Sequence, residues 1–300
     1  MIIDYVVPMV FHKDPLWQQN FRKVNARYDE SNLLDFVRYR SWDTEELLIR
    51  CVKTFMPFVR TIYIILAQES QWQKWMEQPK VKVVYHKDFM PEWTLPTFNS
   101  RAMEMYLRDI SGISDCFLYG NDDMYPVSPL TVEDFFQNGK PRIHMTEKVF
   151  PEHPNNFQSA CMRGLNFVAK EFGQRFTDKW YKNGHSIAPI LKSTCEHLWQ
   201  RGGNEIIASI SPFRQCKNFN QYIYSWWHYL SGNYVEGRPS CKYVSTKSSV
   251  EDVGRAIEEC CGIVCVNDNE CVSDYEVYGR MVREKIEKRL QQYGQENRAA

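Results

Sequence analysis

The chain has 300 residues, of which 37 are basic, 37 are acidic and 14% are aromatic. This length is enough to bury a full core, in one large α/β domain or in one with a helical insertion. Because the charges balance, no strong field steers the protein toward nucleic acid, and we expect no nucleic-acid partner.

The ends and the cysteines of the chain bear on its location. Residues 1–11 have no basic leader and carry Asp4, so they do not predict a secretory signal. No apolar run approaches the roughly 20 residues that span a bilayer. The cysteines show no paired metal-ligand spacing, and no histidines follow the cluster at 260–271, which argues against a zinc site. We therefore expect a reduced, cytoplasmic protein, with the inner face of the membrane as an alternative location.

The first third of the sequence alternates between strand and helix patterns. Apolar runs predict strands at 2–7, 59–66 and 81–85, and amphipathic spacing predicts helices at 44–55 and 71–76. This order is typical of a mostly parallel sheet. Asp4 lies inside the first apolar run, so it is paired, at an exposed strand end, or functional.

The stretch 95–125 carries the strongest local signals. Asn99 or Ser100 caps a predicted helix, which Gly112 ends, and residues 116–119 form a short apolar strand. Asn121, Asp122 and Asp123 follow that strand directly. In open α/β sheets the carboxyl ends of such strands are where ligands bind.

Two interpretations fit this acidic tip. Asp and Asn are ordinary turn residues, so the tip is a simple loop in the first. In the second, Asp122 and Asp123 hold a hard divalent cation, Mg²⁺ or Mn²⁺, that bridges the phosphates of a nucleotide. Glu104, near the start of the preceding helix, adds a third carboxylate.

The pattern of strands and helices divides the whole chain into four parts. The pattern predicts an α/β part at 1–154, a mostly helical subdomain at 155–245, a return to the sheet with a C-terminal helix at 246–290, and a frayed tail at 291–300. The predicted fold class is α/β, with a mostly parallel central sheet of GT-A/Rossmann-like type and a helical subdomain inserted over the crevice.

The helix predicted at 274–290 is amphipathic, and two interpretations of its polar face are open. Its basic side chains rest on a membrane surface in one, and form a solvated face with the interleaved glutamates in the other, which the glutamates favour. These basic residues are Arg283, Lys285, Lys288 and Arg289.

Four sequence blocks resemble the Stealth family of sugar-phosphate transferases, which includes bacterial capsular polysaccharide phosphotransferases and the eukaryotic N-acetylglucosamine-1-phosphotransferase. The strongest is the second block, PTFNSRAMEM followed by FLYGNDDMY. The strand that carries Asp4 is similar to the opening of the first block. The continuation differs, because Met9-Val10-Phe11-His12 stands where many members have Trp-Val-Asp/Asn-Gly, which leaves the donor contacts of this loop and the choice of donor open.

The third block of the family matches this chain in part, and the fourth block matches it moderately well. His185, Pro189 and Arg214 have the spacing of the third block, although an isolated histidine before a helix is more often a cap or packing residue. Asn218 and Asn220 follow Arg214 where the family often has an acid. The fourth block, Cys-x-Asn-Asp at a strand end, matches the sequence CVND that ends at Asp268.

The resemblance implies transfer of a sugar 1-phosphate from a UDP-sugar to a hydroxyl of an acceptor glycan, with release of UMP, in capsular or exopolysaccharide biosynthesis. It also implies that the part at 1–154 binds a nucleotide sugar and a metal, and that the helical subdomain at 155–245 lies on the acceptor side. Under it, Asp122, Asp123 and Asp268 hold the metal, His185 is the base, and Arg214 stabilises charge on the phosphoryl group. Glu104 positions the donor or metal or shares the base function, with Asp123 also counted as catalytic. The substrate contacts are expected at Asp4, Asn99, Asn121 and Asn267.

Two other functions fit the same pattern. A metal-dependent GT-A glycosyltransferase would use the same sheet and acidic tip, but would release UDP. A non-catalytic carbohydrate-binding protein would need neither nucleotide nor metal, and the acidic residues at several strand ends argue against it. The sequence leaves the sugar, the acceptor, the metal and the oligomeric state open.

Overall fold

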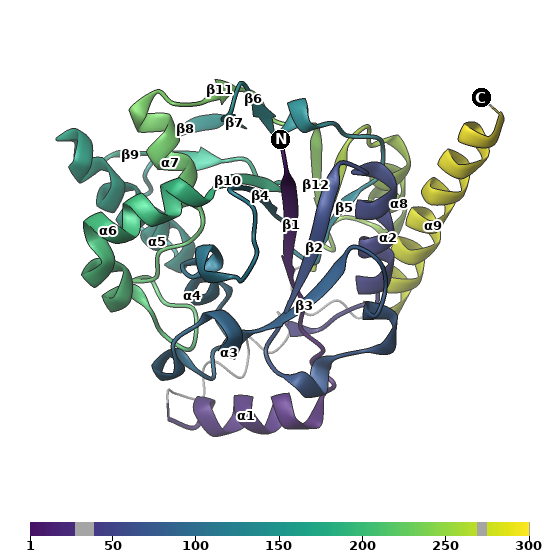
Figure 1. Ribbon diagram of the computed structural model, residues 1–300, viewed down its shortest axis with the longest axis horizontal. Coiled ribbons are helices and arrows are strands. Elements are labelled where there is room, and N and C mark those ends of the chain that lie inside the picture. Colours follow the sequence, from purple (N-terminus) through teal and green to yellow (C-terminus); the bar gives the residue numbers. More distant parts are fainter. Residues whose placement is uncertain (28–38, 269–274, 300) are drawn as a thin grey trace.

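The structure is a computed structural model that describes residues 1–27, 39–268 and 275–299 (Figure 1). Its central sheet has five strands in the order β10-β4-β1-β2-β3. Strands β1 to β4 run parallel, and β10 joins the edge antiparallel to β4. The bounds are β1 Ile3–Pro8, β2 Val59–Leu66, β3 Val81–Tyr85, β4 Cys116–Tyr119 and β10 Ala188–Leu191.

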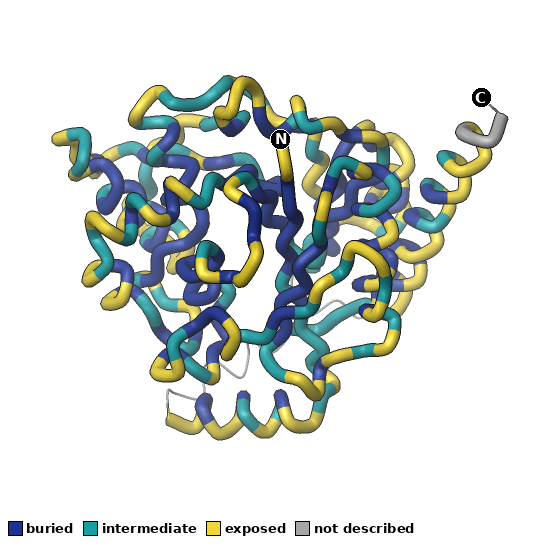
Figure 2. Tube along the Cα trace, viewed as in Figure 1, coloured by how far each residue is buried: buried dark blue, intermediate teal, exposed yellow. Residues whose placement is uncertain are grey.

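Helices cover both faces of this sheet (Figure 1). Helices α2 (Glu45–Phe55), α8 (Val250–Glu259) and α9 (Tyr275–Ala299) pack on one face, and α4 (Ser100–Glu104), α5 (Asn156–Ala169), α6 (Lys192–Ser209) and α7 (Tyr222–Ser231) pack on the other. Because side chains alternate along a strand, Tyr5 and Val7 of β1 enter one core and Val6 enters the other. Figure 2 shows the buried sheet between more exposed outer helix surfaces. The predicted α/β class with a mostly parallel central sheet is confirmed.

A smaller sheet carries the chain away from the acidic tip. Strand β5 (Met124–Pro126) follows the tip and pairs antiparallel with β13 (Ile263–Asn267), which pairs parallel with β12 (Cys241–Ser245). This pairing brings the predicted second and fourth blocks together. The short strands β6 (Phe136–Gln137), β7 (Lys140–Ile143) and β11 (Val235–Glu236) form another sheet, and β8 (Met145–Val149) pairs with β9 (Lys179–Asn183).

Several local predictions differ from the structure. The stretch 155–245 contains the strands β9, β10, β11 and β12 besides its three long helices, and β10 belongs to the central sheet. The apolar run before α6 is therefore a buried edge strand. The helix predicted at 71–76 is two short 3₁₀ turns, Glu69–Gln71 and Lys74–Met76.

Helix α9 continues to Ala299, beyond the end that we predicted at residue 290. Its basic side chains contact the protein itself: Arg289 donates to the carbonyl oxygens of Val127, Glu258 and Cys260, and Lys285 pairs with Glu258 at 2.7 Å. Membrane contact through this helix stays a prediction. None of the helices in the described ranges is both long enough and apolar enough to cross a bilayer.

Asp4 lies at the amino end of β1 and is fully buried. Arg60 donates to both of its carboxylate oxygens, to Oδ1 at 2.9 Å, and the backbone N–H of Ser114 donates to Oδ2 at 2.7 Å. The cavities described below open at the carboxyl ends of the strands and do not include Asp4. The prediction that Asp4 binds substrate is therefore corrected: its carboxylate joins β1 to β2 and to the turn before β4.

We expect Asp4→Asn to lower the free energy of unfolding by about 1–3 kcal/mol, because the substitution breaks a charge-assisted pair around a buried group. Since Asp4 lies outside the cavities, kcat/KM should stay within about twofold of wild type. Urea titration and steady-state kinetics measure the two effects. A large loss of kcat/KM without loss of stability would contradict the structural function.

Candidate active site

The candidate site lies at the switch point of the central sheet. From β1 the chain builds β2 and β3 on one side, and then places β4 on the other side of β1. Ligand-binding crevices form where the connections from adjacent parallel strands diverge in this way. A cavity of about 350 Å³ opens there, lined by Met9 and Val10 after β1 and by Asn121, Asp122 and Asp123 after β4.

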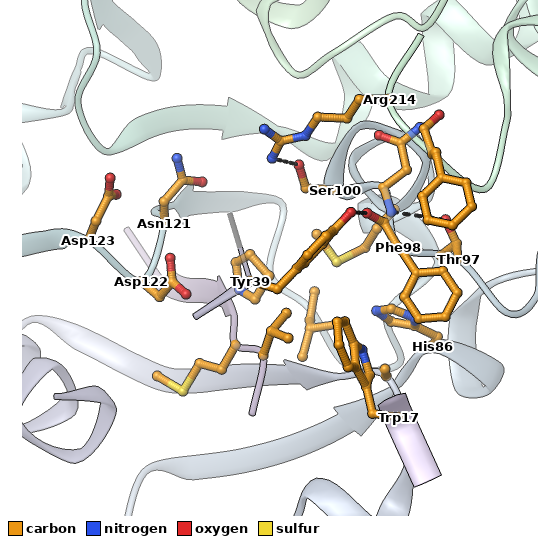
Figure 3. Close-up of a pocket in the computed structure, with 18 of the residues that line it drawn as sticks. Trp17, Tyr39, His86, Thr97, Phe98, Ser100, Asn121, Asp122, Asp123 and Arg214 are labelled. Atoms are coloured by element: carbon orange, nitrogen blue, oxygen red, sulfur yellow. Dashed lines mark hydrogen bonds between the residues drawn. The ribbon is translucent and has the colours of Figure 1, made fainter. Parts of the chain in front are cut away.

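This smaller cavity has an acidic end and an aromatic end (Figure 3). Trp17 of α1 (Pro15–Asn25) lies 5.3 Å from the rings of both Tyr39 and Phe98, between centroids. Asp122 and Asp123 lie at the opposite end, and the Arg214 guanidinium points into the space near Asn121 and Ser100. The cavity can therefore take an elongated ligand with one flat apolar end and one charged end.

A larger cavity of about 860 Å³ adjoins the first. Residues from α4, β8, β9 and the start of α7 line it. The two cavities share Ser100, Asn121, His185, Arg214 and Asn267. The predicted base and the predicted guanidinium therefore lie where the two cavities meet.

The acidic tip is held in place by the small sheet. The backbone N–H of Val266 donates to the Asp123 carbonyl at 3.0 Å. Asn267 Nδ2 and Cys265 Sγ both donate to Asp123 Oδ2, each at 3.3 Å. Burial raises the pKa of the Cys265 thiol, and the charge of Asp123 adds to this shift, so the thiol remains a donor.

Three side chains at this tip form a group that can hold a metal ion. One ligand atom each of Asp123, His185 and Cys265 lies within 4.8 Å of the others. Asp123 Oδ1 and His185 Nε2 are buried and have no hydrogen-bond partner in the described part of the chain. Buried polar atoms are normally paired, so these two atoms fit a ligand or ion between them.

Asp122 lies beside this group and also lines a small pocket of about 110 Å³ toward Glu45. Burial, together with the neighbouring carboxylates of Asp123 and Glu45, raises the pKa of Asp122 to about 7. A cation between Asp122 and Asp123 would relieve this repulsion. The carboxylates suit Mg²⁺ or Mn²⁺, and the imidazole and thiol suit softer ions.

Asp268 lines the smaller cavity, but its carboxylate is already paired. Arg40 donates to both oxygens, through Nη2 to Oδ1 at 2.7 Å, and the Arg40 guanidinium lies 4.1 Å from the centre of the Tyr275 ring. Asp268 is also outside the group of Asp123, His185 and Cys265. Asp268 is therefore a partner of Arg40 at the edge of the site, and its predicted function as a metal ligand stays a prediction.

Arg214 is positioned by a network of amide side chains. Asn99 caps α4 by accepting from the Arg101 N–H, and its Nδ2 donates to the carbonyl oxygens of Ser211 and Phe213 and to Asn218 Oδ1. Arg214 itself donates to Ser100 Oγ at 2.8 Å. Asn99 lines the smaller cavity and helps to fix the loop that carries Arg214, and its predicted substrate contact stays a prediction.

Asn218 completes this network and stands where an acid was expected. Its Oδ1 accepts from the Gln215 N–H at 2.6 Å, and its Nδ2 donates to Ser209 O and Ser211 Oγ. An amide both donates and accepts here, which a carboxylate cannot do. The loop that carries Arg214 is thus fixed without an acid.

We expect Asn218→Ala to destabilise the protein by about 1–3 kcal/mol, because it leaves buried carbonyl and N–H groups unpaired. It should also lower kcat more than it raises KM for the donor, because the Arg214 loop loses its fixed geometry. Thermal unfolding and donor-dependent kinetics measure both. Asn218→Asp is the matched variant, and full activity of Asn218→Ala would contradict the positioning function.

Glu104 lies on the floor of the larger cavity and is buried. Its Oε2 accepts from the Gln221 N–H at 2.8 Å and its Oε1 from the Tyr119 hydroxyl at 3.3 Å. Burial raises the pKa of Glu104, against the hydrogen bond from Gln221 and the charges of Arg214 and Arg101. These contacts link α4, β4 and α7, and its predicted catalytic function stays a prediction.

Comparison with known proteins places the chain in a family. The sequence model described as Stealth protein CR2, conserved region 2, matches residues 38–143. A capsular polysaccharide phosphotransferase of Actinobacillus suis is 30% identical over 265 residues, which cover 82% of this chain and 69% of that protein. The receptor polysaccharide phosphotransferase WefC of Streptococcus oralis is 28% identical, covering 91% and 92%. The capsular polysaccharide phosphotransferase LcbA of Neisseria meningitidis is 28% identical, covering 82% and 70%.

The chain is a transferase, as its relatives and the charged cleft at the switch point of its α/β fold indicate. The chain belongs to the Stealth family.

Proposed function

We propose that this chain transfers a sugar 1-phosphate from a UDP-sugar to a hydroxyl of an acceptor glycan, releasing UMP, in the synthesis of a capsular or other exopolysaccharide. The names of its relatives support phosphotransfer onto a polysaccharide. The observation that carries the proposal is the meeting of two cavities at His185 and Arg214, beside the acidic tip.

The smaller cavity suits the donor. Its aromatic end, formed by Trp17, Tyr39 and Phe98, offers flat apolar surface for a nucleobase. Its acidic end and Arg214 suit a diphosphate with a bound cation. This orientation places the β-phosphate and the sugar toward the larger cavity, where the acceptor glycan binds.

Asp122 and Asp123 would hold the cation, which we propose to be Mg²⁺ or Mn²⁺. When bound, it neutralises charge on the diphosphate. The two unpaired atoms, Asp123 Oδ1 and His185 Nε2, support a ligand at this position.

His185 acts as the base in this proposal. It borders both cavities, and its ring packs edge-on against Tyr243, with centroids 5.5 Å apart. The acceptor hydroxyl gives its proton to His185 as its oxygen attacks the β-phosphorus. The bond from that phosphorus to the bridging oxygen breaks, and UMP leaves. Arg214 stabilises the negative charge on the transferred phosphoryl oxygens.

The nucleotide product tests this function. Incubating the protein and acceptor glycans with a panel of UDP-sugars should yield UMP with at least one sugar. Release of UDP would instead support a metal-dependent glycosyltransferase. Glycan binding that requires neither nucleotide nor metal, with no turnover, would support a carbohydrate-binding protein.

The acidic tip makes cation binding depend on pH. Because the pKa of Asp122 is raised to about 7, the folded chain keeps a proton there that the unfolded chain has lost, and the metal-free protein loses stability as the pH rises through about 7. A cation needs the carboxylate, so Mn²⁺ should raise Tm more at pH 8 than at pH 6.

Thermal unfolding with and without MnCl₂ at the two pH values measures this difference. In Asp122→Asn the metal-induced shift in Tm should become nearly independent of pH. An equal shift at both pH values in the wild type would contradict the placement of the cation at Asp122.

A further inference from the structure

The larger cavity is strongly basic, although the whole chain is neutral. Five basic side chains line it, and among the described lining residues Glu104 is the single acid. Glu104 already accepts two hydrogen bonds on the cavity floor. The basic residues are Arg101, Lys148, Lys182, Arg214 and Arg238.

The hairpin of β8 and β9 sorts charges between its two faces. In the antiparallel register Thr146 lies opposite Lys182, and Lys148 lies two residues further on the same face. These three residues line the cavity. Glu147 alternates to the other face, where it pairs with Lys179 at 2.9 Å. Strand alternation thus directs lysines into the cavity and the acid away from it.

Arg238 reaches the cavity over a glycine. A Cβ at Gly184 would lie 1.3 Å from Arg238 Nη1, so a side chain at that position would displace the guanidinium. Gly184 directly precedes His185. The absence of a side chain there leaves room for the Arg238 guanidinium beside the residue that precedes the proposed base.

The five basic side chains of the larger cavity need a negative partner when a ligand displaces the water around them. A neutral glycan would leave them without one. Arginine forks and lysine ammonium groups are typical of phosphate binding, and charge-assisted hydrogen bonds to phosphate are about twice as strong as neutral ones. The donor's own phosphates are taken by the smaller cavity in the proposed function.

We infer that the larger cavity binds an acceptor glycan that carries phosphate near the reacting hydroxyl, with Lys148, Lys182 and Arg238 as its contacts. This inference rests on the proposed function for its assignment of the acceptor side. The phosphate has two sources: a phosphate at the reducing end of the glycan, as in a lipid-linked diphosphate, or a phosphodiester between two sugars.

Binding to the donor-free protein tests the inference without turnover. The probes are maltose, maltose 1-phosphate and a disaccharide whose two sugars are joined by a phosphodiester. We expect at least one phosphate-bearing probe to bind about tenfold or more tightly than maltose. The double variant Lys148→Gln/Lys182→Gln should lose most of this preference, and Lys179→Gln, on the opposite face of the hairpin, should keep it.

Tight binding of maltose 1-phosphate alone assigns the reducing-end phosphate, and tight binding of the bridged disaccharide alone assigns the internal phosphodiester. Equal affinity for maltose and both phosphate probes overturns the inference, as does an unchanged preference in the double variant. Equal affinity for a disaccharide that carries a carboxylate overturns the choice of phosphate.

Failure of this inference and failure of the proposed function give different results. Release of UMP with no preference for phosphate probes overturns the inference alone. A preference for phosphate probes that depends on Lys148 and Lys182, with no UMP from any UDP-sugar, supports the anion site and contradicts the proposed reaction.

Discussion

Arg214→Ala is expected to lower kcat by about 10²-fold or more, with little change in thermal stability. The side chain is exposed and makes one described hydrogen bond, to Ser100 Oγ, so its removal leaves the fold intact. Its guanidinium stands where the two cavities meet, and its loss removes a positive charge from the transferred phosphoryl group.

Arg214→Lys separates charge from geometry. Lysine keeps the charge but lacks the planar fork, so we expect only partial recovery of kcat. The control is Arg255→Ala, because Arg255 lies exposed on α8 with a single described partner, Asp252 at 3.4 Å. Stopped-time assays of nucleotide release measure all three, and near wild-type turnover of Arg214→Ala would remove it from the chemistry.

Asp123→Asn is expected to lower turnover by about 10²-fold or more and to weaken metal affinity. The asparagine side chain has nearly the same shape as aspartate. It lacks the negative charge near His185, which in Asp123 is shared by the unpaired Oδ1. Calorimetric titration with Mn²⁺ and kinetics measure the two effects. Asp115→Asn is the matched control, since Asp115 is exposed just before β4.

His185→Ala distinguishes two functions of the imidazole. As the base, His185 is needed for turnover but not for the cation, so the variant should lose about 10²-fold in kcat and keep Mn²⁺ affinity within a few-fold. If His185 is instead a metal ligand, the variant would lose kcat and Mn²⁺ affinity together. A joint loss in His185→Ala, like that expected for Asp123→Asn, would reassign His185 to the metal.

Local sequence signals predicted the main strands well. The runs that became β2, β3 and β4 have the same bounds in sequence and structure, because buried parallel strands are short apolar segments with clear ends. Strand β10 was missed, since its apolar run leads directly into α6 and pairs with β4, about seventy residues earlier in the chain. Pairing over such distances leaves no local pattern.

The site shows the same division between local and distant information. The acidic tip was found because it follows a strand directly. Asp4 was misassigned, although its place at the start of a parallel strand puts it at the end of the sheet away from ligands. Arg40 was one of several arginines in a polar stretch, and only the folded chain shows that it pairs with Asp268.

Cys265 and the cations of the larger cavity other than Arg214 were also not predicted as site residues. Cys265 points at Asp123 because β13 pairs with β5, which no local pattern in either segment predicts. The alternation of Lys148 with Glu147, and of Lys182 with Tyr181, was a usable signal once these segments were recognised as paired strands.

Labelling the β-phosphorus of the UDP-sugar gives the most direct test of the proposed reaction. If the acceptor hydroxyl attacks that phosphorus, the label moves into the glycan as a phosphodiester and the released nucleotide, UMP, is unlabelled. Label found in released UDP, with a glycan free of phosphorus from the donor, would contradict the account.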